Sequence, residues 1–499
     1  MANIDYNYFI SPHASRRRPA LTRELTKRAY AVKDTISLAE GMPNEVTFPF
    51  EKMQILLKDG SSITLQGQQL HAALQYIPTQ GYPPLVKTLK EFMQKVHQPP
   101  NWQDRELLVT NGSQDGISKT IELCIQEGDP VLVQDPLYAG AEIVLKPFKA
   151  ELIPVEHDQH GMSAQQLMNV LEDRKAKYTE EGGGCKMPKL LYINPTGSNP
   201  AGTTMPAERR KEIYNICCKY NILILEDDAY CFMHFLDENP PSFLSLDTEG
   251  RVVRLDSLSK VLSSGLRMAW ITGPKQIIAN IELHIQSSCL HSSTLSQVIT
   301  ENLFQVWGHD KFMEHLSFIR KYYKARRDLT IDAMERHLKG LCEWNVPTGG
   351  MFVWIKVKGV SDVYDMLMSR GLKKGITFVP GHAFMADPTK ACNYIRASYS
   401  KVPPKQIEKA MKLLAELIRE EHLLLLFWNS SRDVIEQSFF GFFYGLELNQ
   451  PFEQFGPKFW FQYLPRVDFE EWAAHNLTIF PNKAANSRHD AFDIDPSTG

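Results

Sequence analysis

The order of apolar and amphipathic segments constrains the fold of this chain more than any other feature. From about residue 105, short apolar segments alternate with loops that contain Gly or Pro and with amphipathic segments. The apolar segments are ELLVT, VLVQD, KLLYIN, ILILED, VVRLDS and MAWITG, which begin at residues 106, 131, 189, 222, 252 and 268. Nearly continuous apolar strands that alternate with helices predict a parallel sheet covered on both faces, so we expect an α/β domain.

Polar residues follow most of these apolar segments. The loops NGSQ, DPLY, NPTGSNPAG, EDDAY and DSLSK begin at residues 111, 135, 194, 226 and 256. In an open α/β sheet the ligand lies beyond the carboxyl ends of the strands. We therefore expect these five loops to converge on one pocket.

The pattern changes after about residue 310. A long helical segment is followed by GGMFVWIKV, GITFVPG and NYIRASYS and by a final helix, QIEKAMKLLAELIREE. Strand and helix signals mixed in this order predict a second, smaller α+β domain. The expected divisions are an N-terminal segment (1–75) that packs on the small domain, a large domain (76–310), the small domain (311–420) and an atypical, poorly ordered tail (421–499).

Composition excludes several classes of partner. The net charge of -3 shows no basic excess, so we expect no nucleic acid, and no apolar run is long enough to span a membrane. The eight cysteines include no Cys-x-x-Cys and no zinc-type spacing, which favours a reducing compartment and no metal. The N-terminus lacks an apolar secretory core but carries three arginines at 16–18. We expect a cytoplasmic protein, with the mitochondrial matrix as the alternative.

The segment DSLSKVLSSGLR at 256–267 is the most informative one. Lys260 follows a strand, between Ser257 and Ser259 on one side and Arg267 on the other. A lysine in this setting offers an amine nucleophile beside hydroxyl donors and a guanidinium suited to a phosphate. Taken alone, Ser-x-Ser-Lys is more typical of a solvated lysine in a Ser-rich loop.

Together the loops resemble those of the fold type I pyridoxal 5′-phosphate (PLP) aminotransferases, over about residues 8–420. The family signature appears here in order as Asp-Asp-Ala-Tyr at 227–230, then Lys260, then Arg267. The resemblance implies PLP as cofactor and a large domain with a mainly parallel, seven-stranded sheet beside a smaller α+β domain. It also implies a homodimer with shared active sites, in which the N-terminal segment contacts the dimer partner.

The resemblance assigns catalytic roles to Lys260, Asp227 and Tyr138. Lys260 would bind the cofactor covalently and then move a proton, Asp227 would pair with the pyridine nitrogen, and Tyr138 would stack on the ring. Tyr230 and Asn199 would bond the phenolic oxygen. The phosphate would be held by Ser113, Gln114, Ser257, Ser259 and Arg267.

The chain carries two similar motifs, Asn-Pro-Thr-Gly at 194–197 and Asn-Pro-Ala-Gly at 199–202. Asn199 stands at the family's spacing before Asp227, whereas Asn194 lies five residues too early. We therefore interpret Asn199 as the functional residue and Asn194 as a continuation of the strand into the loop.

The resemblance also implies a set of substrate-binding residues. Arg396, in NYIRASYS, matches the arginine that grips the substrate α-carboxylate through a bidentate fork. Tyr76 matches a tyrosine that reaches the site of the neighbouring subunit. Gly41 and Asn199 complete the expected set.

Within fold type I, the nearest likeness is to the kynurenine/α-aminoadipate aminotransferase group, through ISLAEGMPN, LQYIPTQGYPPL and SKVLSSGLRMAWITGPK. This implies transfer of an amino group to 2-oxoglutarate from kynurenine, α-aminoadipate or other large aromatic or aliphatic donors. The chain has Glu40-Gly41 where relatives commonly have Gly-Gly, which predicts weaker activity with α-aminoadipate. A PLP-dependent lyase or synthase on the same fold, and a PLP-sensing regulator, are the alternatives.

Overall fold

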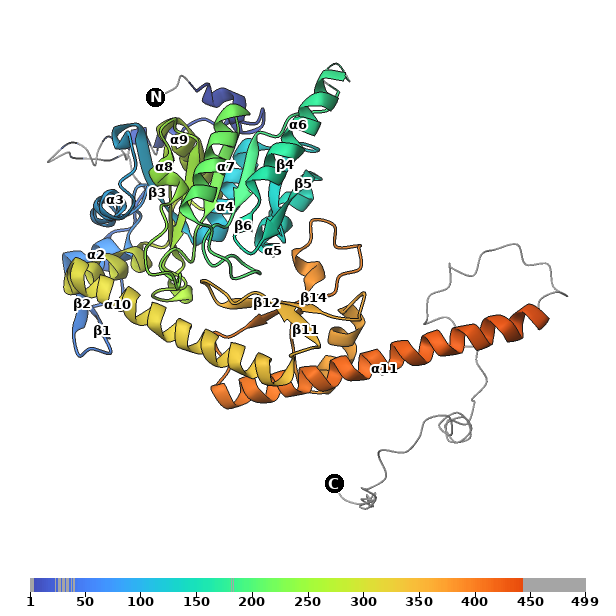
Figure 1. Cartoon of the computed structure of the whole chain (residues 1–499). Helices are drawn as coiled ribbons and strands as arrows, with labels where there is room; N and C mark the ends of the chain where they lie inside the picture. The colour runs from blue at the N-terminus through green and yellow to red at the C-terminus, as the bar shows by residue number, and fades with distance from the viewer. Residues whose placement is uncertain are drawn as a thin grey trace. The chain divides into compact units, whose positions relative to one another are not determined.

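An eight-stranded mixed sheet forms the centre of the large domain (Figure 1). The computed structural model describes residues 4–22, 24–25, 28, 32, 36, 38, 41–180, 182 and 184–442, with side chains through residue 426. The strands are β3 (Arg105–Asn111), β4 (Pro130–Asp135), β5 (Glu151–Asp158), β6 (Gly161–Met162), β7 (Leu190–Ile193), β8 (Leu223–Asp227), β9 (Val252–Ser257) and β10 (Met268–Pro274). Their order is β3-β10-β9-β8-β7-β4-β5-β6.

The sheet is mainly parallel, as the sequence predicts. Strands β5, β4, β7, β8 and β9 pair in parallel, whereas β10 is antiparallel to both β9 and β3. The α/β class is confirmed. The count differs from the expected seven strands because β6, a two-residue strand, folds back antiparallel on β5. A strand this short leaves no apolar pattern in the sequence.

Helices cover both faces of this sheet. Along β8, Leu223 and Leu225 belong to one core cluster and Ile224 to the other, as expected for alternating side chains. One cluster includes residues of α3 (Pro83–His97), α6 (Ala164–Glu180) and α7 (Ala207–Lys219), and the other includes residues of α4 (Ser113–Cys124), α5 (Ala139–Leu145) and α9 (Lys275–Ser288). A short helix, α8 (Phe243–Leu246), follows β8. No helix among the described residues is long and apolar enough to cross a membrane.

The small domain is built on a four-stranded antiparallel sheet. Its strands are β11 (Cys342–Trp344), β12 (Phe352–Val357), β13 (Val379–Pro380) and β14 (Tyr394–Ser398), in the order β11-β12-β14-β13. Helix α10 (Thr294–His337) runs from beside α2 (Gln68–Leu74) towards this sheet, with a non-helical residue at Gly308 (Figure 1). The small-domain core also includes residues of the last described helix, α11 (Pro404–Phe442).

Helix α11 spans Pro404–Phe442, so the expectation that it ends near residue 420 is wrong. Glu421 forms an ion pair with Arg370, His422 bonds the Lys358 carbonyl at 2.7 Å, and Leu425 packs on the small-domain core. Residues 4–425 thus belong to one compact unit, and residues 443–499 of the expected tail lie outside the described residues.

The N-terminal residues also differ from expectation. Phe9, Ile10 and Ala14 join the core cluster of the large domain, whereas we expected this segment on the small domain. The hairpin of β1 (Lys52–Leu56) and β2 (Ser62–Gln66) packs with α2 and α10. The remaining short helices are η1 (Tyr6–Phe9), η2 (Ala14–Arg16), η3 (Glu45–Thr47), η4 (Trp102–Asp104), η5 (Lys146–Phe148), η6 (Ser264–Leu266), η7 (Met366–Gly371) and η8 (Gly381–Phe384).

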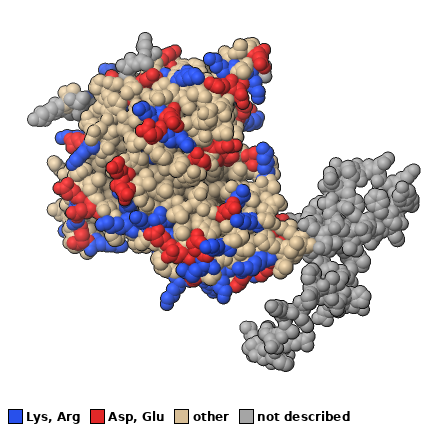
Figure 2. Space-filling view, in the orientation of Figure 1, with Lys and Arg blue, Asp and Glu red and all other residues tan. Residues whose placement is uncertain are grey.

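Acidic and basic side chains are mixed over the visible face of the described residues (Figure 2). Neither sign dominates there, in agreement with the small net charge of the chain.

Candidate active site

The buried carboxylate of Asp227 lies at the end of β8 and is the centre of the site. Its Oδ2 accepts a hydrogen bond of 2.7 Å from the Tyr192 phenol, while its Oδ1 has no partner among the described residues. Burial raises the pKa of Asp227 to about 6, against the effect of the Tyr192 hydrogen bond, which lowers it. A buried carboxylate oxygen without a partner is costly unless a donor reaches it, and a protonated ring nitrogen is such a donor.

Lys260 lies in the loop that follows β9 and is half-buried. Its Nζ is 5.9 Å from the centre of the Tyr230 ring. Burial lowers the pKa of Lys260, the positive charge of Arg267 lowers it further, and Asp227 opposes both effects. A lowered pKa leaves more of the amine neutral, which is the form that attacks an aldehyde.

The start of α4 forms an anion-binding corner. Gly112 caps the helix with φ +83°, a conformation that favours glycine, and a Cβ built there would lie 2.0 Å from Arg267 Nη2 and would displace this guanidinium. Arg267 Nη2 donates to the Asn111 carbonyl at 3.2 Å. The Ser259 amide donates to Ser257 Oγ at 3.1 Å in the next loop. A helix N-terminus with a neighbouring guanidinium suits a phosphate group.

Tyr138 caps α5 and faces this corner from the next loop. Its phenol donates to Gln114 Oε1 at 3.4 Å, and Gln114 Nε2 donates to the Gly140 carbonyl at 2.6 Å. Burial raises the pKa of Tyr138. The pair therefore places an aromatic ring beside the first turn of α4, where Ser113 begins the helix.

The two asparagines have different surroundings. Asn194 Nδ2 donates to the Asp227 carbonyl at 2.5 Å, and Asn194 Oδ1 accepts from the Asn199 amide at 2.9 Å. The Asn199 side chain instead accepts from Arg396 Nη1 at 2.9 Å. Asn194 is thus more than a continuation of the strand, because its side chain ties the ends of β7 and β8 together and holds the backbone of Asn199.

Arg396 reaches the site from β14 of the small domain. Its guanidinium carbon lies 4.3 Å from the ring centre of Phe352 and 4.7 Å from that of Phe384. Its Nε is buried and has no hydrogen-bond partner among the described residues. Burial lowers the pKa of Arg396. A desolvated guanidinium held between two rings can receive a carboxylate ligand.

Two expected substrate-binding residues, Tyr76 and Gly41, have no contact with Asp227, Lys260 or Arg396 among the described residues. Tyr76 is 43% exposed, and its ring packs against His291 with the ring centres 5.8 Å apart. Gly41 is exposed, with no other atom within 4 Å of a Cβ built on it. Glu40 lies outside the described residues, so its effect on α-aminoadipate stays a prediction.

Two buried residues near the site were not predicted from the sequence. Tyr192 is fully buried and touches Asp227 directly, and Arg254 is a fully buried arginine in β9. The available signal was a polar side chain inside an otherwise aliphatic strand, in LLYI and in VVRL. Such a group needs a partner when buried. Tyr192 finds Asp227 in the neighbouring strand β8. Arg254 finds Glu226 in β8 and Asp256 in its own strand.

Comparison with known proteins gives consistent results. Residues 48–414 match the family described as aminotransferase class I and II. The chain is 41% identical to the mitochondrial kynurenine/alpha-aminoadipate aminotransferase of Bos taurus over 424 residues, which cover 84% of this chain and all of that protein.

Two solved structures show the same fold. The kynurenine aminotransferase of Pyrococcus horikoshii, solved with PMP and with kynurenine as substrate, is 32% identical with a TM-score of 0.66, over 84% of this chain and 98% of that one. The aminotransferase Aro8 of Candida albicans is 27% identical with a TM-score of 0.74, over 84% of this chain and 99% of that one.

Proposed function

The chain belongs to the class I and II aminotransferases, a PLP-dependent family, and on this premise we propose that it transfers the amino group of kynurenine and other large amino acids to 2-oxoglutarate. The names of the bovine protein and of the archaeal structure support the donor. The main observation within this chain is Oδ1 of Asp227, which has no hydrogen-bond donor among the described residues although Lys260 lies near enough to act on this carboxylate electrostatically.

PLP, when bound, supplies an aldehyde that reacts with amines and a ring that withdraws electrons from the substrate Cα. We assign Lys260 as the amine that holds the cofactor and then moves the proton from the substrate Cα. Asp227 would keep the ring nitrogen protonated, because an ionised carboxylate stabilises the cation that it faces. Tyr230 and Asn199 would bind the phenolic oxygen, with Tyr138 stacked on the ring.

The phosphate would lie at the start of α4. Arg267 supplies a fixed positive charge there, and the backbone amides of Ser113 and Gln114 point outward from the first turn of the helix. The hydroxyl groups of Ser257 and Ser259 complete the anion site.

Arg396 would bind the α-carboxylate of both the amino donor and 2-oxoglutarate. The two substrates share this group and differ in their side chains, so one guanidinium can serve both half-reactions. Selection of the side chain then falls to other segments, including the loop with Gly41.

We propose a homodimer in which Tyr76 contributes to the site of the other subunit. Its 43% exposure and its lack of contact with Lys260, Asp227 or Arg396 within the described chain support this arrangement. The compartment is proposed to be the mitochondrial matrix, because the bovine relative is mitochondrial by name. Fractionation of cells that make the full chain separates this location from the cytoplasm that the sequence favours.

The proposal is tested by labelling and by turnover together. Borohydride reduction of the PLP-bound protein, followed by peptide mapping, should place the cofactor on Lys260. Lys260→Ala should lower transamination of kynurenine by several orders of magnitude, while Lys275→Ala, at the exposed start of α9, should not. Label on another lysine, or no 2-oxoglutarate-dependent formation of a keto acid from any amino acid of a broad panel, would refute the assignment.

A further inference from the structure

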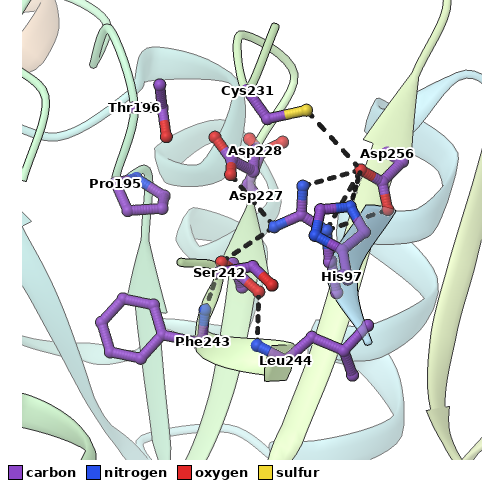
Figure 3. Close-up of polar contacts among 12 residues, drawn as sticks. His97, Pro195, Thr196, Asp227, Asp228, Cys231, Ser242, Phe243, Leu244 and Asp256 are labelled. Carbon is purple, nitrogen blue, oxygen red and sulfur yellow. Dashed lines mark hydrogen bonds and ion pairs between the residues drawn. The ribbon is translucent and has the colours of Figure 1, made fainter. Parts of the chain in front are cut away.

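A buried charged cluster lies beside the end of β8, next to the candidate site, and Figure 3 draws its polar contacts. The cluster consists of Arg254 and three carboxylates, Glu226, Asp228 and Asp256, with side chains no more than 2% exposed. In Figure 3, Asp228 and Asp256 lie on opposite sides of the dashed contacts that converge between them.

Arg254 contacts both sequence neighbours of Asp227. Its Nη1 lies 2.9 Å from Glu226 Oε1 and 3.0 Å from Asp228 Oδ2. Side chains alternate along a strand, so residues 226 and 228 point away from the face that carries the Asp227 carboxylate. The two neighbours of Asp227 are therefore held by one guanidinium from behind.

The other edge of the same guanidinium binds a carboxylate of its own strand, β9. Arg254 Nε lies 3.1 and 3.0 Å from the two oxygens of Asp256, and its Nη2 lies 2.7 Å from Asp256 Oδ1. Asp256 directly precedes Ser257, whose hydroxyl accepts the Ser259 amide in the loop that carries Lys260. Arg254 thus connects the end of β8 to the start of the lysine loop.

A further shell closes the cluster. The two oxygens of Glu226 accept the amides of Phe243 and Leu244 at 2.8 and 3.1 Å. His97 Nε2 lies 3.9 Å from Asp256 Oδ1, and burial holds the pKa of His97 well below its usual range. With a neutral imidazole, Arg254 is the cation in direct contact with the three carboxylates.

We propose that Arg254 is a positioning residue for the cofactor site, which sets the distance between the ring-nitrogen partner Asp227 and the loop of Ser257 and Lys260 without touching the cofactor. The inference rests on the proposed function of Asp227 and Lys260. Its physical basis is the planar fork of the guanidinium, which fixes several oxygens at once where an ammonium group would hold them as a point charge.

A purely structural role makes a different prediction. Buried ion pairs often contribute little net stability compared with apolar side chains, but removal of one partner leaves an uncompensated charge. Loss of Arg254 would then destabilise the fold and leave the cofactor site of the folded protein unchanged. A positioning role requires that the cofactor itself responds in the folded protein.

The chain offers a matched control for this comparison. Arg105 is a second buried arginine of the same sheet, paired with Asp247 at 2.7 Å with both side chains fully buried. It lies at the opposite end of β3 from Asn111 and the anion-binding corner. Arg105→Lys therefore reproduces the loss of a buried guanidinium fork at a position remote from the candidate site.

The experiment compares Arg254→Lys with Arg105→Lys in the full chain. Thermal unfolding should show a lower Tm for both variants. PLP titration of the apoprotein should show a Kd raised about tenfold or more for Arg254→Lys alone, in the range found when outer residues around metal sites are replaced. The absorbance of the bound cofactor should also titrate at a different pH in Arg254→Lys and at the wild-type pH in Arg105→Lys.

Wild-type Kd and absorbance in folded Arg254→Lys would overturn the proposal. If that variant does not fold, Asp256→Asn decides, because it keeps the guanidinium of Arg254 and weakens its link to the lysine loop. An unchanged Kd and spectrum of Asp256→Asn would also refute positioning. Borohydride label on a lysine other than Lys260 would instead refute the proposed function, which separates the two failures.

Discussion

Replacement of Tyr192 by Phe tests the electrostatics of the cofactor site most directly. Tyr192 donates its phenolic hydrogen to Asp227 Oδ2 at 2.7 Å, and both groups are buried. A hydrogen bond to a charged group contributes about 1.5–3 kcal/mol. Because one pKa unit corresponds to about 1.4 kcal/mol, loss of this bond from the ionised form should raise the pKa of Asp227 by about one to two pH units.

The expected result follows from the sign of this change. The pKa of Asp227 is about 6, so the carboxylate that binds the ring nitrogen is present above pH 6 and is lost as the pH falls through that value. Affinity of the apoprotein for PLP should therefore fall through a midpoint near pH 6 in the wild type. In Tyr192→Phe the midpoint should move to about pH 7–8.

The assay is a PLP titration of the apoprotein between pH 5 and pH 9, followed by absorbance. Tyr214→Phe is the matched control, because Tyr214 donates to the buried Asp247 at 3.1 Å, away from the candidate site. It should lower the Tm and leave the midpoint of PLP binding unchanged. A Tyr192→Phe protein that folds and binds PLP with the wild-type midpoint would refute this account of Asp227.

Three further predictions concern other parts of the chain. Asn199→Ala should shift the absorbance of bound cofactor and lower activity, whereas Asn194→Ala should mainly lower the Tm, because its side chain bonds backbone groups; equal spectral effects would contradict the distinction. Arg396→Lys should raise KM for both kynurenine and 2-oxoglutarate with little change in PLP affinity, and steady-state kinetics with each substrate varied would show whether only one responds. Removal of residues 427–499 should leave both PLP binding and the Tm unchanged. Removal of residues 421–499 should lower the Tm, because it also removes Glu421 and Leu425.

Sequence motifs point to candidate site residues at the ends of strands and in the loops that follow them. Each loop after a strand carries polar residues that an apolar strand does not explain, and the roles proposed for Asp227, Lys260 and Arg267 come from the resemblance of these loops, taken together, to a known family. Arg396 could be assigned in the same way, but its placement between Phe352 and Phe384 depends on packing between strands distant in sequence.

Residues inside the strands were harder to interpret. The apolar pattern predicts that a residue of β7 or β9 is buried, but not which neighbouring strand it meets. Tyr192 meets Asp227 through the pairing of β7 with β8, and Arg254 meets Glu226 through the pairing of β8 with β9. The extension of α11 was missed for a related reason, since its aromatic residues obscure the helical period beyond residue 421.

The guanidinium of Arg396 spans two domains, because it belongs to β14 and donates through Nη1 to Asn199 in the loop after β7. Its Nε, which has no partner among the described residues, lies on the other edge of the fork. A carboxylate can therefore bind through Nε and Nη2 while the bond to Asn199 persists. A substrate carboxylate would then bind without displacing Asn199 from Arg396. The contact between the two domains would stay formed when the amino donor is exchanged for 2-oxoglutarate between the half-reactions.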